Sequence, residues 1–249
     1  MRIEHPASTD LPQLRALWKE AFGDTDSYLD IFFSAAFSPD RCMCVYTDSR
    51  IAAAAYWMDC SIGEHTAAYI YAVATAQDHR GNGFCRALMD AIHTHLEQAG
   101  YCGSILVPGD QGLRTMYGNM GYADFGGVRE FICGPGPASA ELQRICKEKF
   151  ADIRRSLLPE NAVLQEGAGL TLLDALVEFY QGDACLLTLY RDGRTLRVLE
   201  YLGDEAAAAG IAAALGGITT FRAPGKNPYA MYRPLSAAPI PGYFAFAFD

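Results

Sequence analysis

The stretch 73–89 combines three local signals that allow few arrangements of the chain. An apolar, β-branched segment ends at Thr75 and predicts a strand, and a turn with two glycines follows at 80–83. From Phe84 onward, apolar residues recur at helical spacing. A strand that passes through a glycine-rich turn directly into a helix predicts an α/β unit, with the turn at one edge of the sheet.

This turn has the chemistry of an anion site. Gly81 and Gly83 permit backbone angles that side chains disfavour, so consecutive N–H groups can point into one concavity. The first N–H groups of a helix have no partner within the helix and carry partial positive charge, and Arg80 adds a cation. A plain strand-to-helix turn is the alternative. The segment lacks the Gly-Lys-Ser/Thr of a Walker loop. It also lacks the third glycine and the downstream acid of a dinucleotide-binding motif, which argues against a nucleotide-dependent dehydrogenase.

A second motif lies about one helix and one strand further along. Residues 113–122 predict a short helix that carries Tyr117 and ends at Gly121, with an aromatic strand start at Tyr122. Asp110 precedes this helix and places a negative charge in its first turn.

With both motifs in place, residues 71–122 resemble the acyl-CoA-binding core of the GNAT superfamily of N-acyltransferases. The family signature Arg/Gln-x-x-Gly-x-Gly/Ala stands at 80–85. This chain departs from the family pattern at Cys85, at Gln77 in place of the usual proline, and at Asp110 in place of the usual asparagine. The segments 17–24 and 69–75 are similar to the bacterial branch of enhanced-intracellular-survival acetyltransferases. The resemblance covers residues 1–133.

The resemblance implies an α/β fold with a mixed central sheet and the transfer of an acyl group, most simply acetyl, from acyl-CoA. The acceptor would be the primary amine of a small or peptidic cationic molecule, which attacks the thioester directly. Tyr117 would donate a proton to the leaving thiolate. The residues that would contact acetyl-CoA are Val73, Ala74, Thr75, Arg80, Gly81, Asn82, Gly83, Phe84 and Cys85.

Two other roles are less defined. A backbone N–H near Val73 is our candidate donor to the oxyanion. For the base that deprotonates the amine, the sequence leaves several groups open: Asp59, Glu64, Glu20, His65 and the terminal carboxylate of Asp249. Six aromatic residues could line an acceptor pocket or serve as core and sheet packing: Tyr28, Phe32, Tyr56, Trp57, Tyr69 and Tyr71.

The composition limits the classes of molecule that this protein is expected to bind. The 249 residues carry a net charge of −9, which argues against nucleic acid binding. Residues 1–133 hold nine Lys/Arg and sixteen Asp/Glu, a balance of −7 that serves solubility or attracts a cationic substrate. We find no run of about 18 apolar residues and no signal-peptide core, so we expect no membrane association and a cytoplasmic location.

The cysteines and histidines predict no metal site. The chain has eight cysteines, which we expect to be reduced, and their spacing matches no zinc motif. His93 and His95 are two residues apart on a predicted helix, and we interpret both as surface residues. Homo-oligomer formation is left open.

The second half begins after the break Gly134-Pro135-Gly136-Pro137, which divides the chain into domains 1–133 and 134–249. The pattern predicts a hairpin within 122–133, then helices at 139–157, 170–180 and 205–215. It also predicts a hairpin at 185–201 and strands at 217–222 and 243–248. This order predicts a degenerate GNAT-like copy whose acidic turn 201–205 would repel pyrophosphate; an unrelated α+β cap is the alternative.

The competing function is a catalytically silent acyl-CoA sensor or scaffold. The departures at Gln77, Cys85 and Asp110 favour it, whereas a retained Tyr117 favours an enzyme.

Overall fold

The computed structural model describes residues 1–237 and 240–246. By their contacts, these residues form two compact units. The first contains residues 1–123, 165–172 and 231–237, and the second contains 124–164, 173–230 and 240–246. The contacts therefore group the residues differently from a single cut after Cys133, and the assignment of 1–133 and 134–249 as two domains stays a prediction.

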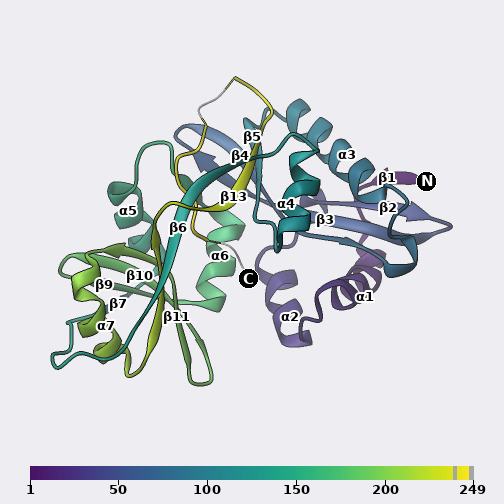
Figure 1. The fold of residues 1–249 in the computed structure, drawn as a ribbon. Coiled ribbons are helices and arrows are strands. Elements are labelled where there is room, and N and C mark those ends of the chain that lie inside the picture. The colour runs from purple at the N-terminus through teal and green to yellow at the C-terminus, as the bar shows by residue number, and fades with distance from the viewer. Residues whose placement is uncertain (238–239, 247–249) are drawn as a thin grey trace. The chain divides into compact units, whose positions relative to one another are not determined.

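The first unit is built on a mixed sheet (Figure 1). Its antiparallel strands are β1 (Arg2–Glu4), β2 (Cys42–Thr47), β3 (Arg50–Ile62) and β4 (His65–Thr75). The short strand β5 (Gly103–Leu106) then runs parallel to β4. The residues Met231–Pro234, at the end of β13 (Asn227–Pro234), pair antiparallel with β5.

Helices cover both faces of this sheet (Figure 1). α1 (Leu11–Phe22) and α2 (Asp26–Ala35) pack their aromatic residues on one face, where the ring centroids of Trp18 and Tyr56 are 5.1 Å apart. α3 (Phe84–Gln98) covers the other face with a stripe of fully buried leucine, methionine and isoleucine residues. α4 (Gln111–Gly118) follows β5.

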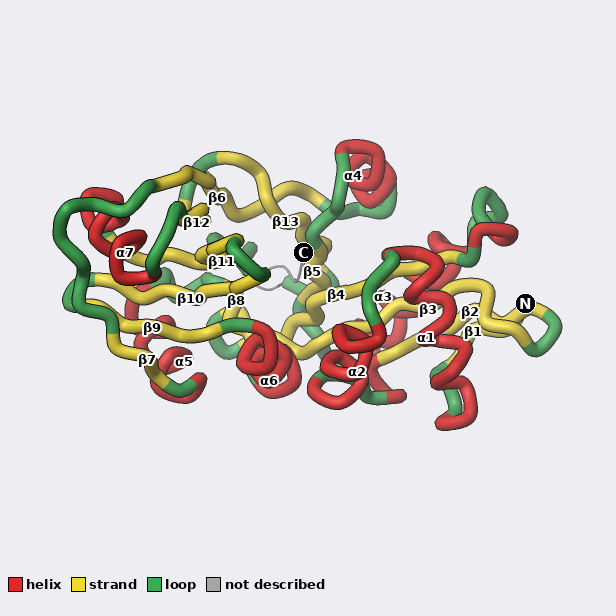
Figure 2. Tube along the Cα trace, turned by 90° about the horizontal axis from the view of Figure 1, so that it is seen from below, coloured by secondary structure: helices red, strands yellow, loops and turns green. Residues whose placement is uncertain are grey.

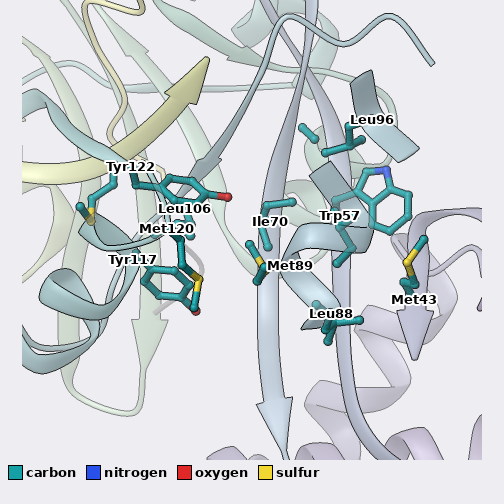
Figure 3. Packing of buried hydrophobic residues seen from close by; sticks show 14 of the residues in the cluster. Met43, Trp57, Ile70, Leu88, Met89, Leu96, Leu106, Tyr117, Met120 and Tyr122 are labelled. Carbon is teal, nitrogen blue, oxygen red and sulfur yellow. The ribbon is translucent and has the colours of Figure 1, made fainter. Parts of the chain in front are cut away.

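The main core of the first unit lies under α3. Figure 3 shows Leu88 and Met89 of α3 packed near Ile70 of β4, with Tyr117, Met120 and Tyr122 gathered on one side of this cluster. The α4 segment is therefore attached to the same core as the helix that follows the glycine turn.

The second unit repeats this plan. Its elements are β6 (Ala123–Cys133), β7 (Gln143–Ile145), α5 (Lys147–Leu157), β9 (Glu178–Gly182), β10 (Cys185–Asp192), β11 (Thr195–Gly203), α7 (Ala208–Leu215) and β12 (Thr219–Pro224). The residues of β8 (Val163–Gln165) and α6 (Gly167–Leu176) are divided between the two units, because 165–172 belong to the first. β9, β10 and β11 are antiparallel, and α7 then leads into β12, which is parallel to β11.

The same order, an antiparallel meander followed by a helix and a parallel strand, occurs in β2–β3–β4–α3–β5 of the first unit. Figure 2 shows α5 and α7 on either side of strands β9 to β11. The predicted fold class, an α/β GNAT fold followed by a degenerate GNAT-like half, is confirmed.

One strand in each unit pairs with a partner that is distant along the chain. β6 follows α4, yet from Asp124 onward it belongs to the second unit, where it pairs with β12. The end of β13 comes after the second unit's elements and pairs with β5 in the first. The first unit therefore contains a strand from near the end of the chain, and the second unit joins its first strand, β6, to the much later strand β12.

Several predicted elements were wrong. Residues 123–133 form one strand, because the partner of this strand is β12 and no hairpin mate follows it. The helix predicted at 139–157 is divided into β7 and α5, and the one predicted at 170–180 ends at Leu176 before β9. β13 was not predicted. In the predicted strand 243–248, Tyr243 forms a single bridge with Ala162, and residues 247–249 lie outside the described part.

All eight cysteines are free thiols, and Cys42, Cys44, Cys60 and Cys102 are buried. Among the described residues, no helix is both long enough and apolar enough to cross a bilayer.

Candidate active site

β4 carries an irregularity just before the glycine turn. Tyr71 is opposite Tyr56 on β3 and Ala74 is opposite Ala54, so a single residue of β3 faces the two residues Ala72 and Val73. Ala72 has a φ of 49°, in the left-handed region that alanine rarely adopts. This is a β-bulge, which interrupts the ladder and turns backbone groups away from the neighbouring strand. It supports the candidate oxyanion donor near Val73.

β4 and β5 pair over a short distance only. Ala68 is opposite Ser104 and Tyr69 is opposite Ile105, and β4 then continues to Thr75 after β5 has ended at Leu106. Beyond this pairing, the edge of β4 has no β5 partner in the described structure. Val73, Ala74 and Thr75 lie on this unpaired stretch, where an extended ligand could bind the backbone as an added strand does.

The glycine turn presents its backbone outward. Gly81 and Gly83 have φ values of 79° and 78°, and Gly83 is the N-cap of α3. Within residues 1–237 and 240–246, none of the hydrogen bonds uses the N–H of Gly81, Asn82 or Gly83 as donor. A Cβ at either glycine would meet no atom within 4 Å, so the space in front of the turn is open.

Side chains hold the turn in this shape. The Asn82 amide donates to the carbonyl of His79 at 3.1 Å, and Arg80 Nε donates to the carbonyl of Thr75 at 3.1 Å. Glu20 accepts from the N–H of Gln77 at 2.5 Å. Arg80 is thus directed back to the end of β4 while its side chain stays exposed.

Tyr117 is presented by α4 from within the core. It is only 6% exposed, and burial, with smaller contributions from Cys85 and Tyr122, raises the pKa of its hydroxyl well above the usual value. The hydroxyl is therefore protonated at neutral pH and can donate. Asp110 caps α4 by accepting from the N–H of Leu113 at 2.7 Å, which shows what an acid does at this departure from the family pattern.

The helix after the turn and the helix of Tyr117 are tied together. Arg86 of α3 donates to the carbonyl of Asn119, at the C-terminal end of α4, over 3.3 and 3.4 Å. Phe84 and Cys85 occupy the first turn of α3 and are half-buried against the core that contains Tyr117. Burial raises the pKa of the Cys85 thiol.

The candidate bases lie apart from one another. Glu64 and His65 occupy the β3–β4 turn, at the end of β4 that is about 30 Å from Thr75 along an extended strand. Asp59 accepts from Arg41 at 3.0 and 2.9 Å and from the Tyr101 hydroxyl at 2.6 Å, beside a cavity of about 410 Å³ near Thr66. Of the four side chains, Glu20 contacts Gln77, shortly before the glycine turn. Asp249 lies outside the described residues.

The six aromatic residues differ in how far they are buried. Four are at most 3% exposed and serve as packing: Phe32, Tyr56, Trp57 and Tyr69. Tyr28 and Tyr71 are half-buried, and their hydroxyl oxygens are 2.5 Å apart. Asp24, which accepts from Trp18 Nε1 at 2.8 Å, is near enough to contribute to the raised pKa of Tyr71.

The prediction that His93 is a surface residue was wrong. His93 is 1% exposed and bonds to the Tyr122 hydroxyl at 2.9 Å and to Arg233 at 2.8 Å. Its spacing relative to Met89, Ile92 and Leu96 places it on the apolar face of α3, a signal that was available in the sequence. No local pattern could have connected it to Arg233.

The chain is similar to a known protein family and to solved structures. Residues 2–124 match the family profile described as Acetyltransferase (GNAT) domain. No curated protein matches the chain.

Solved structures share the fold over 94% of this chain. A GCN5-related N-acetyltransferase from Kribbella flavida superposes with a TM-score of 0.70 at 18% identity, over 70% of its own length. One from Anabaena variabilis gives 0.71 at 16% identity over 73%. Eis1 from Mycobacterium abscessus gives 0.65 at 11% identity over 74%. By its match to the family profile, the segment 2–124 is a GNAT acetyltransferase domain.

Proposed function

We propose that the first unit transfers an acetyl group from acetyl-CoA to the primary amine of a small or peptidic cationic acceptor by direct attack. The observation that carries this proposal is that three features occur together in the first unit. These are the unpaired edge of β4 at 73–75, the open turn at 80–83 and the buried hydroxyl of Tyr117.

The turn fits a diphosphate. The N–H groups at 81–83 have no donor role inside the described structure, the space before them is open, and the dipole of α3 begins there. Arg80 adds a positive charge. The unpaired edge of β4 would bind the amide groups of the pantetheine arm. Acetyl-CoA, when bound, supplies the activated acyl group.

A protein group is then assigned to each step of the reaction except the deprotonation of the amine. The acceptor nitrogen attacks the thioester carbon, and a backbone N–H at the Ala72–Val73 bulge stabilises the oxygen as it becomes negative. The C–S bond breaks and the sulfur takes the Tyr117 proton. The amine proton passes to a base that we do not assign.

The acceptor side favours a cation. Tyr28 and Tyr71 form a half-buried pair, and the carboxylate of Asp24 lies near them. Ring faces and a nearby carboxylate attract an ammonium group, in line with the balance of −7 over residues 1–133.

A pair of glycine variants tests the binding step. Gly83 and Gly100 lie at opposite ends of α3, have φ values of 78° and 81°, and both have open space around them. Alanine at either position introduces about 1–2 kcal/mol of backbone strain. Gly83→Ala should weaken CoA binding, measured by titration calorimetry, by about tenfold or more, because the turn amides shift. Gly100→Ala should leave it unchanged, and equal effects of the two substitutions would contradict the cradle.

Tyr117→Phe tests the chemical step. Without its proton donor the enzyme should lose about 10²- to 10⁴-fold in kcat, whereas CoA affinity should stay the same. Thiol release from acetyl-CoA with polyamines, aminoglycosides and peptides measures this. An unchanged kcat would remove Tyr117 from the mechanism. Tight CoA binding by the wild-type protein without turnover on any acceptor would instead support the silent sensor.

A further inference from the structure

A chain of buried polar side chains lies behind Tyr117. Arg233 Nη1 is 2.8 Å from His93 Nδ1, His93 Nε2 is 2.9 Å from the Tyr122 hydroxyl, and that hydroxyl is 2.7 Å from Ser104 Oγ. His93, Ser104 and Tyr122 are at most 4% exposed. All four residues belong to the first unit.

The directions of the first two hydrogen bonds in this chain follow from its first member. A guanidinium can only donate, so Nδ1 of His93 accepts and its proton lies on Nε2. Nε2 then donates to the Tyr122 oxygen, and the Tyr122 and Ser104 hydroxyls share the last hydrogen bond. Burial and the charge of Arg233 lower the pKa of His93 to about 3, so the imidazole is neutral and the order is fixed.

The same arginine also holds the end of the Tyr117 helix. Arg233 Nη1 donates to the carbonyl of Met120 at 2.9 Å. The rings of Tyr117 and Tyr122 are 5.8 Å apart, centroid to centroid, and Figure 3 shows both beside Met120. Arg233 thus binds the segment directly after α4 at Met120.

These contacts connect α3, β5 and the segment after α4, and the proposed reaction depends on the spacing of these elements. His93 lies on α3, which begins at the glycine turn; Ser104 lies on β5 and pairs with Arg233 in the register of β13. The diphosphate and the thioester sulfur are a fixed length of CoA apart. The proton donor must therefore be held at a set distance from the turn, within fractions of an ångström.

We propose that Arg233, contributed by the late strand β13, is a positioning residue that sets Tyr117 against the acyl-CoA thioester. This inference rests on the proposed acetyl transfer and adds a residue that lies outside the matched region 2–124. Arg233 acts through Met120 and the His93–Tyr122 pair, and it does not touch the reacting atoms.

The test compares three variants of the full chain. Arg233→Met removes the hydrogen bonds to His93 and to the Met120 carbonyl, whereas Arg233→Lys keeps a donor that can reach one of these two acceptors. Tyr232→Phe is the matched control, because Tyr232 is the adjacent residue of the same strand and donates a buried hydrogen bond to the Cys102 carbonyl at 3.1 Å, away from α4.

We expect Arg233→Met to lower kcat about 10- to 100-fold with CoA affinity unchanged, and Arg233→Lys to recover part of kcat. Tyr232→Phe should keep the wild-type kcat although it also loses a buried bond. Proton NMR of the His93 imidazole supplies a readout that needs no turnover: its pKa should rise in Arg233→Met, because the neighbouring cation is gone.

Two outcomes would overturn the inference. The first is a wild-type kcat in Arg233→Met. The second is a fall in kcat that Tyr232→Phe reproduces, since that would show general destabilisation. Absence of acetyl transfer by the wild-type enzyme would instead refute the proposed function, and the NMR titration would then still test the contact between Arg233 and His93.

Discussion

Individual residues of the site differ in how far local sequence defines them. Gly81, Gly83 and Tyr117 have the conformations and burial that their motif predicts, because a turn and a helix are set by nearby residues. Arg233 and His93 are 140 residues apart, and their contact exists only after the sheet has formed. The residues that we propose to contact CoA could therefore be named from the sequence, whereas those that we propose to hold Tyr117 in place could not.

The buried histidine predicts a pH dependence of stability. The pKa of His93 is about 3 in the folded protein and near 6.5 when unfolded, so between these values the unfolded chain binds the proton more readily. The free energy of unfolding should fall as pH decreases through this window, by up to about 1.4 kcal/mol per pH unit from this group. His93→Gln keeps a donor and an acceptor but cannot be protonated.

Denaturant titrations of the wild-type and His93→Gln proteins from pH 7 to pH 4.5 measure the difference. The wild type should lose stability relative to the variant as pH falls, because all other titrating groups are shared. Parallel curves would show that His93 is already protonated or is exposed.

At the scale of elements, the sequence predicted the strand that ends at Thr75, the helix that begins at Phe84 and the short helix that carries Tyr117, which correspond to β4, α3 and α4. The errors at 122–133, 139–157 and 170–180 lie where short strands join helices and where β6 takes a distant partner. The bulge at Ala72 had no signal either, since alanine is not a residue that favours a positive φ.

The bulge itself can be tested by substitution. Ala72→Val should lower the free energy of unfolding by about 1–2 kcal/mol, because a β-branched residue opposes the φ of 49°, and kcat should fall as the bulge is lost. Ala72→Gly accepts the same φ and should keep kcat near the wild-type value. Thermal unfolding and thiol-release assays report both quantities. Equal kcat in the two variants would separate the bulge from catalysis.

At the scale of the whole molecule, the break at Gly134–Pro137 predicted a point where the pattern changes, and the family match ends nearby, at residue 124. Neither defines a part that is complete by itself. The first unit takes the end of β13, with Arg233, from more than a hundred residues downstream, and it yields β6 to the second. Sequence patterns report neighbours along the chain and are silent about such exchanges.

A fragment of residues 1–133 should therefore be deficient. Without β13 it exposes the edge of β5 and the buried faces of His93 and Ser104, so it should aggregate or unfold and should release no thiol from acetyl-CoA. Circular dichroism and the activity assay on this fragment, beside the full chain, decide the matter. A folded, active fragment would mean that β13 is dispensable.

The exchange of β6 and β13 has a consequence for a chain that is cut. A protease that cleaved between Gly134 and Pro137 would leave two polypeptides, each of which supplies a strand to the other's sheet, through β5–β13 and through β6–β12. The two pieces would stay associated through these strand pairings without a covalent link, as in split-protein complementation. Separately produced halves should then restore activity only when they refold together.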